Sequence, residues 1–107
     1  MTMPSNPRLV EVPYDTGEIR CRYARVLAPD GTSWIRHGLY REYDRDGQII
    51  SEGSYKNGKE DGLWRVWYPN GQLAAEGHYE NGAGFGWRYW DSDGTLRDRG
   101  RVAGPVL

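Results

Sequence analysis

Apolar and polar side chains alternate at every second position along most of the chain, which is the pattern of strands that face two environments. The alternation predicts strands over residues 9–14, 18–27 and 32–37. Pro13 places the first of them at a sheet edge or strand end, because proline cannot donate to a ladder hydrogen bond. Helix formers in amphipathic register are missing, and the sequence therefore predicts an all-β chain.

Pairs of Asn or Asp followed by Gly interrupt the alternation at short intervals, and such pairs favour two-residue hairpin turns. Six of these pairs mark the predicted turns, namely Asp30-Gly31, Asp46-Gly47, Asn57-Gly58, Asn70-Gly71, Asn81-Gly82 and Asp93-Gly94. Their spacing predicts a continuous antiparallel meander, and if every turn has two residues, positions equidistant from a turn face each other.

The central stretch, residues 61–81, is copied on both sides of itself, and fixed self-similarity is typical of repeat architectures. Gly38 recurs as Gly62, 24 positions later, and a third copy with one residue deleted begins at Gly86. We predict one domain, residues 1–107, made of a flexible tail (1–8), a degenerate N-terminal capping hairpin region (9–37), two full repeats (38–61 and 62–85), a truncated repeat (86–104) and a second tail (105–107).

The predicted register separates two kinds of position. An aromatic residue faces a glycine in each repeat, as Tyr40 with Gly53, Trp64 with Gly77 and Trp87 with Gly100, so we expect the ring to lie across the bare backbone. On the other side of the sheet the register pairs Arg41 with Glu52, Arg65 with Glu76 and Trp67 with Ala74. We expect the aromatic–glycine pairs to be structural, and the residues on the other side of the sheet to face solvent.

Residues 62–82 read G-L-W-R-x-W-Y-x-N-G-Q-L-x-x-E-G-x-Y-x-N-G. This pattern resembles the MORN repeat variant found in bacterial proteins described as antitoxin or immunity components of toxin systems. The resemblance implies an elongated, twisted, single-layer antiparallel sheet of stacked β-hairpins that serves as a non-catalytic binding platform. The chain departs from the pattern at residues 82–86, where we expect a flexible glycine-rich corner.

Charge and composition narrow the function classes. The formal net charge is −1, with 14 basic and 15 acidic side chains, so no overall field draws the chain to nucleic acid or to an anionic membrane. The lone Cys21 excludes an internal disulfide and a cysteine-based metal site. The amino terminus has no apolar signal core and no run is long enough to span a membrane, so we expect a cytoplasmic protein.

Candidate catalytic and metal-binding residues do not form a recognisable set. His37 and His78 fall in different predicted hairpins, and residues 91–94 begin like a calcium loop but lack the distant Glu that closes one. We therefore expect no enzyme activity, no metal and no cofactor.

Arginine and aromatic residues recur on the outward side, and both are enriched in interface hot spots. The predicted partner-binding residues are Arg41, Tyr43, Arg65, Trp67, Arg88, Trp90, Arg97, Arg99 and Arg101. The third repeat breaks the charge scheme, since the register places Arg88 opposite Arg99 and Arg97 opposite Trp90. Like charges in direct opposition are unfavourable, so this cluster is either an acceptor for carboxylates or phosphate, or a solvated surface.

These residues and the resemblance lead to a protein-binding module, of which an antitoxin that covers a cognate toxin is the first interpretation. The alternative is a scaffold that assembles with itself, for example as a homodimer through uncapped edges. Phospholipid binding is the weaker third interpretation, because the net charge is near zero.

Overall fold

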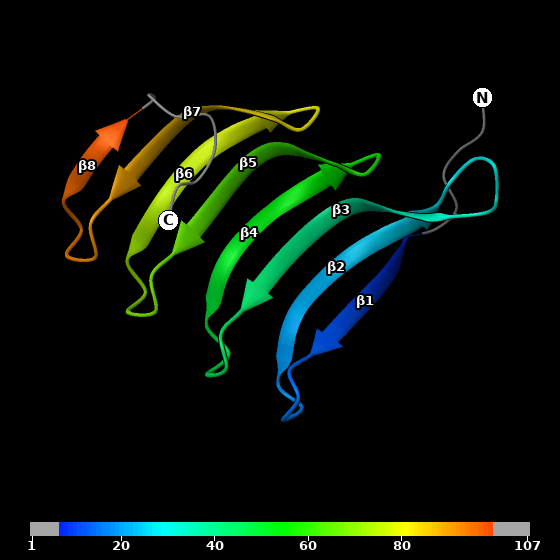
Figure 1. Ribbon diagram of the computed structural model, residues 1–107, viewed down its shortest axis with the longest axis horizontal. Helices are drawn as coiled ribbons and strands as arrows, with labels where there is room; N and C mark the ends of the chain where they lie inside the picture. Colours follow the sequence, from blue (N-terminus) through cyan, green and yellow to red (C-terminus); the bar gives the residue numbers. More distant parts are fainter. Residues whose placement is uncertain (1–6, 100–107) are drawn as a thin grey trace.

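The structure, a computed structural model, describes residues 7–99, with Asp98 and Arg99 described in their backbone alone. These residues form one sheet of eight strands in the order of the sequence, each antiparallel to the next (Figure 1). The strands are β1 (Arg8–Pro13), β2 (Ile19–Leu27), β3 (Trp34–Tyr43), β4 (Ile49–Lys56), β5 (Lys59–Trp67), β6 (Leu73–Glu80), β7 (Ala83–Trp90) and β8 (Leu96–Arg99).

The predicted all-β, single-layer antiparallel meander is confirmed. The Cα atoms span 46 × 35 × 15 Å, so the molecule is one sheet thick in its shortest direction. The strands are curved in the same direction in Figure 1. Every connection between them is a short turn at one end of the strands or the other. A single layer cannot bury both of its faces, so the two faces must stabilise themselves differently.

The turns at the two ends of the strands differ, and the prediction of two-residue turns is correct only for Asn57-Gly58 and Asn81-Gly82. Asn57-Gly58 and Asn81-Gly82 each have two positive φ angles, 51° and 85° in the first and 50° and 84° in the second, as that turn requires. At the opposite ends of the strands each turn has three residues. In one of them Tyr68 N donates to Gln72 O at 2.9 Å, and this hydrogen bond encloses residues 69–71. The turns at residues 15–17, 45–47 and 92–94 have the same bonds. The Asp30-Gly31 turn lies at the same end of the strands as Asn57-Gly58 and Asn81-Gly82, but it contains four residues between Ala28 and Ser33.

The extra turn residue is compensated one step into the strand by a β-bulge. Trp67 pairs with Leu73, and Val66 pairs with Ala75, so Ala74 is an inserted residue. The predicted pairing of Trp67 with Ala74 is therefore wrong. Beyond the bulge the register returns to the predicted one, as Trp64 with Gly77, because the longer turn and the inserted residue offset each other.

A second set of bulges lies in the middle of the strands and follows glycines in the left-handed region. Between the pairs Glu52–Arg65 and Ser54–Asp61, β4 has one residue and β5 has three, and Gly62 there has φ +84°. Gly38 lies in the same arrangement between β2 and β3, where residues 37–39 of β3 stand opposite one residue of β2. A strand bends at such a bulge, which accounts for the arched strands of Figure 1.

Aromatic rings fill one face of the sheet, which we call the aromatic face. It carries Tyr40, Tyr55, Trp64, Val66, Ala75, Tyr79, Trp87 and Tyr89. Trp87 is 1% exposed, and consecutive rings such as Tyr79 and Trp87 meet edge to face at 5.6 Å between centroids. These rings serve as the hydrophobic core of a sheet that has no second layer.

The glycines under these rings are explained by contact, although the covering ring comes from a different strand than predicted. A Cβ atom on Gly77 would collide with the ring of Trp87 on β7, and one on Gly53 would collide with Trp64 on β5. The sequence prediction assigned each glycine to the aromatic residue opposite it in its own hairpin, Trp64 to Gly77 and Tyr40 to Gly53. Those pairs exist in the backbone register, but the ring over each glycine belongs to the next hairpin. Gly100 lies outside the described residues.

Two further expectations differ from the structure. Residues 82–86 do not form a flexible corner, because β7 begins at Ala83 and pairs with β6 through Ala83–Glu80 and Phe85–His78. Strand β1 begins at Arg8, inside the predicted tail of residues 1–8. The strands expected over residues 9–14, 18–27 and 32–37 are present as β1, β2 and the first part of β3.

Candidate functional site: the charged face

The face opposite the aromatic rings carries a row of charged residues that crosses the sheet, and we call it the charged face. Backbone pairing aligns one residue from each strand, in the order Glu11, Arg22, Arg41, Glu52, Arg65, Glu76, Arg88 and Arg99. Alternation along a strand puts these side chains on the side away from Trp64 and Trp87. The predicted residues Arg41, Arg65 and Arg88 therefore share one row.

Ion pairs hold most of this row within hairpins. Arg41 Nε lies 2.8 Å from Glu52 Oε2, and Arg65 Nε lies 2.7 Å from Glu76 Oε2. The hydrogen bond to Glu52, with a second one to Tyr43, raises the pKa of the Arg41 guanidinium. Pairs as exposed as these contribute about 0.2–1 kcal/mol, so they define the register more than they stabilise the sheet.

Arg88 differs from its equivalents in the first two repeats. Its backbone lies between Glu76, which is ion-paired with Arg65, and Arg99. Within the part of the chain that the structure describes, Arg88 has no ion pair, and its side chain is exposed. The predicted opposition of Arg88 and Arg99 is confirmed in the backbone register.

The rest of the predicted arginine cluster is not brought together. Trp90 pairs with Leu96, so Arg97 is the inserted residue of a bulge and does not face Trp90 as predicted. Arg97 Nε lies 3.6 Å from Asp91 Oδ1, which balances its charge. The side chain of Arg99 and all of Arg101 lie outside what the structure describes. Of the four arginines, Arg88 alone is a described and unbalanced charge.

The predicted aromatic residues form a second row, next to the three-residue turns. Tyr43 pairs with Ile49, Trp67 with Leu73 and Trp90 with Leu96, each at the bulge beside its turn. All three aromatic side chains are half-buried. The Arg22 guanidinium lies 5.7 Å from the centroid of the Tyr43 ring, which joins the aromatic row to the charged row.

A third row of exposed apolar residues was missed by the sequence prediction. Leu39 is 40% exposed, Leu63 41% and Phe85 52%. They lie on the charged face, and the charged row separates them from the row of Tyr43, Trp67 and Trp90. Leu39 and Leu63 belong to the mid-strand insertions, whereas the third repeat has no equivalent residue and places Phe85 against His78, with ring centroids 5.6 Å apart. The repeated Gly-Leu pair was the available signal.

A concentration of arginine near β1–β3 was also missed. Arg8, Arg25 and Arg36 align across these strands. Arg25 lies 4.6 Å from the centroid of the Trp34 ring, and Arg36 lies 4.6 Å from that of Tyr23. Burial lowers the pKa of Arg36, but the hydrogen bond to Tyr55 Oη and the surrounding tyrosines outweigh it and raise the pKa. Here the π-systems of tyrosine and tryptophan rings contact the arginines, whereas carboxylates pair with the arginines of the charged face.

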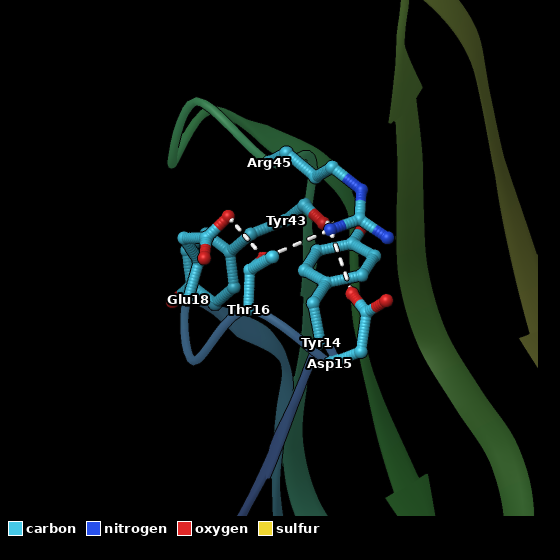
Figure 2. A network of polar contacts seen from close by, with 6 residues as sticks. All are labelled: Tyr14, Asp15, Thr16, Glu18, Tyr43 and Arg45. Carbon is cyan, nitrogen blue, oxygen red and sulfur yellow. Dashed lines mark hydrogen bonds and ion pairs between the residues drawn. The ribbon is translucent and has the colours of Figure 1, made fainter.

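Side chains also tie adjacent three-residue turns together. Figure 2 shows the first contact: Arg45 lies 4.4 Å from the centroid of the Tyr14 ring and donates to Asp15 and Thr16 at 3.0 and 2.9 Å. Tyr14 Oη donates to the carbonyl oxygen of Tyr43 at 2.7 Å. Thr16 in turn donates to Glu18, which lowers the pKa of that carboxyl group. These contacts fix the first and second three-residue turns relative to each other.

The described residues contain no group of three or more His, Cys, Asp and Glu side chains that could hold a metal ion. Between residues 7 and 99 there is also no helix of the length and apolar character that crossing a membrane requires. The largest pKa change described here belongs to Tyr40 on the aromatic face: burial, followed by the charge of Glu42, raises its pKa to about 12.

Comparison with known proteins agrees with the hairpin geometry. Searches among curated proteins and among solved structures found no match. The family model of the MORN repeat variant matches residues 36–57 and 60–81, which are the hairpins β3–β4 and β5–β6, each with its three-residue turn. The middle of the sheet is therefore a pair of adjacent hairpins similar to the MORN repeat variant, a repeat of the binding or scaffold type.

Proposed function

We propose that this chain is a non-catalytic module that binds a protein through its charged face. The observation that carries the proposal is a difference between the faces: the rings of the core cluster on the aromatic face pack against one another, whereas the charged face leaves Leu39, Leu63 and Phe85 exposed beside a row of arginine and glutamate. Exposed apolar side chains gathered on one face are typical of interaction sites. Arginine and aromatic residues beside them are the residue types that dominate binding energy.

The partner that we propose is a toxin, which the module neutralises by covering its working surface. The charged row supports this mode of binding, because a fixed pattern of positive and negative side chains gives specificity and register to a rigid protein surface. A sheet that spans 46 × 35 Å also offers the area of a standard interface, about 800 Å² on each partner. Binding of this kind needs no chemistry from the module.

The test compares three proteins purified from the native host: the wild type, Leu63→Asp and Trp34→Asp. Leu63 is 41% exposed on the charged face, and Trp34, 44% exposed next to Arg25, is the matched control. We expect a stoichiometric complex with the wild type and the control, and its loss with Leu63→Asp at unchanged melting temperature. The captured protein, expressed alone, should arrest growth, and co-expression of the module should restore it.

Two results would overturn the proposal. Equal capture by all three proteins would remove the charged face as the binding surface. A captured protein that is harmless when expressed alone would remove the toxin. Self-assembly is the alternative, favoured by the presence of β1 and β8 as outer strands of the described sheet. It predicts light scattering from dimers or larger species without any partner.

A further inference from the structure

The four three-residue turns are equivalent in backbone geometry but not in the residue that precedes each of them. That residue is Tyr14, Asp44, Tyr68 and Asp91 in chain order. Tyr14 Oη reaches the Tyr43 carbonyl oxygen of the next hairpin at 2.7 Å, and Tyr68 Oη reaches the Trp90 carbonyl oxygen at 2.8 Å. Each tyrosine ring therefore joins its own turn to the following one.

Asp44 stands where the second tyrosine of the series would stand, and its short side chain does not make the same connection. Its Oδ1 atom accepts hydrogen bonds from Asp46 N and Gln48 N, at 2.9 and 3.0 Å, within its own turn. Between this turn and the next lies an open pocket of about 540 Å³. The pocket thus occupies the one junction between described turns at which neither a Tyr14-like nor a Tyr68-like bridge is made.

The lining of the pocket combines apolar walls with two carboxylates. Its main components are Glu42, Asp44, Ile50, Val66, Trp67 and Pro69. Glu42 accepts a long hydrogen bond of 3.4 Å from Tyr40 Oη. Among the described side chains no Lys, Arg or His forms an ion pair with Glu42 or Asp44, whereas Glu11, Glu52 and Glu76 all have an arginine partner. The pocket therefore has uncompensated negative charge within apolar walls.

We propose that this pocket binds the side chain of an arginine from a protein partner. The arginine stem is apolar and can lie along Ile50 and Val66, while the guanidinium is planar and suits both carboxylate pairing and stacking on an aromatic ring. The bound arginine takes the volume that tyrosine fills at the junctions on either side. Glu42, Ser51 and Val66 line the pocket from the aromatic face, so the inference goes beyond the proposed binding through the charged face. Its test needs no protein partner, so the two proposals can fail separately.

The test uses butylguanidinium as the probe and butylurea as its neutral isostere. In ¹H–¹⁵N spectra of the full chain we expect saturable shifts at the Trp67 indole and at the amides of Asp44 and Ala74 with butylguanidinium, and none with butylurea. Equal shifts with both compounds would overturn the charge argument. Tighter binding of butylammonium than of butylguanidinium would overturn arginine as the occupant.

Three variants locate the binding. Asp44→Asn keeps an oxygen that can accept the turn hydrogen bonds, and it should weaken butylguanidinium about fivefold, the range of one solvent-accessible ion pair. Asp44→Tyr should abolish binding and raise the melting temperature, because the ring restores the bridge made by Tyr14 and Tyr68. Asp46→Asn removes an exposed charge from the same turn outside the pocket and should bind like the wild type. Unchanged binding by Asp44→Tyr would overturn the proposal.

Discussion

The two faces of this sheet are made by alternate residues of the same strands, yet they obey different physical rules. On the aromatic face, Trp87 is 1% exposed and Trp64 7% exposed, and their rings pack over Gly77 and Gly53. On the charged face the equivalent neighbours are ion pairs such as Arg65–Glu76, whose side chains are 41% and 27% exposed. The aromatic face supplies most of the packing that stabilises the sheet, and the charged face exposes charged and apolar side chains to solvent.

The difference shows how a single layer can leave a face available for binding. Burying a large aromatic side chain contributes several times more than an exposed ion pair, about 3–5 against 0.2–1 kcal/mol. Because the aromatic face already holds the sheet together, residues on the charged face can change without loss of the fold. Arg88 is an example: the equivalent residues Arg41 and Arg65 form ion pairs, whereas Arg88 forms none among the described residues.

The largest expected effect belongs to the aromatic face. Trp87→Ala should lower the free energy of unfolding by about 3–5 kcal/mol, because it removes the most deeply buried ring of the core cluster. Trp34→Ala, at a tryptophan that is 44% exposed, should cost less than about 1 kcal/mol, within the range for surface substitutions plus one cation–π contact. Urea unfolding followed by circular dichroism measures both. Similar costs for the two would contradict the assignment of the core to this face.

A smaller effect tests which ring covers which glycine. Gly77→Ala should cost about 1–3 kcal/mol, because its Cβ would meet the Trp87 ring and overpack the core. In a Trp87→Ala background the clash is gone, so the same substitution should cost little. A double-mutant cycle measures this coupling. If Trp64, which pairs with Gly77 in the backbone, covered it instead, the Trp64→Ala background would relieve the cost.

That experiment addresses a point at which sequence reasoning failed for a definable reason. Counting outward from each turn gives the partner within a hairpin, and it gave Arg65–Glu76 and Trp64–Gly77 correctly even though the turn length was wrong, because the bulge at Ala74 restores the count. Counting does not give the partner on the other side of a strand, since the insertions at Gly38 and Gly62 shift that register. The covering rings and the exposed leucines both depend on it.

The candidate site was predictable to a similar extent. Arg41, Arg65 and Arg88 were placed in one row because their spacing follows the repeat, and the structure has them there. Arg97 was misplaced because a bulge beside a three-residue turn moves its neighbour Leu96 opposite Trp90. The Asp44 pocket was not foreseen, because it depends on a tyrosine that is absent from one turn and on the contacts which that tyrosine makes in others.

The smallest expected effect is on the charged face itself. A double-mutant cycle of Arg65→Ala and Glu76→Ala should give a coupling of about 0.2–1 kcal/mol, because the 2.7 Å contact joins side chains that water still reaches. The coupling should shrink as salt is raised from low to high ionic strength, since exposed charges are screened. Arg88→Ala serves as the control, because the described structure gives Arg88 no ion pair to lose, and its cost should lie within about 0.5 kcal/mol of zero. A coupling of several kcal/mol that resists salt would mean that the charged row is part of the core, and the division between a stabilising face and a binding face would then be wrong.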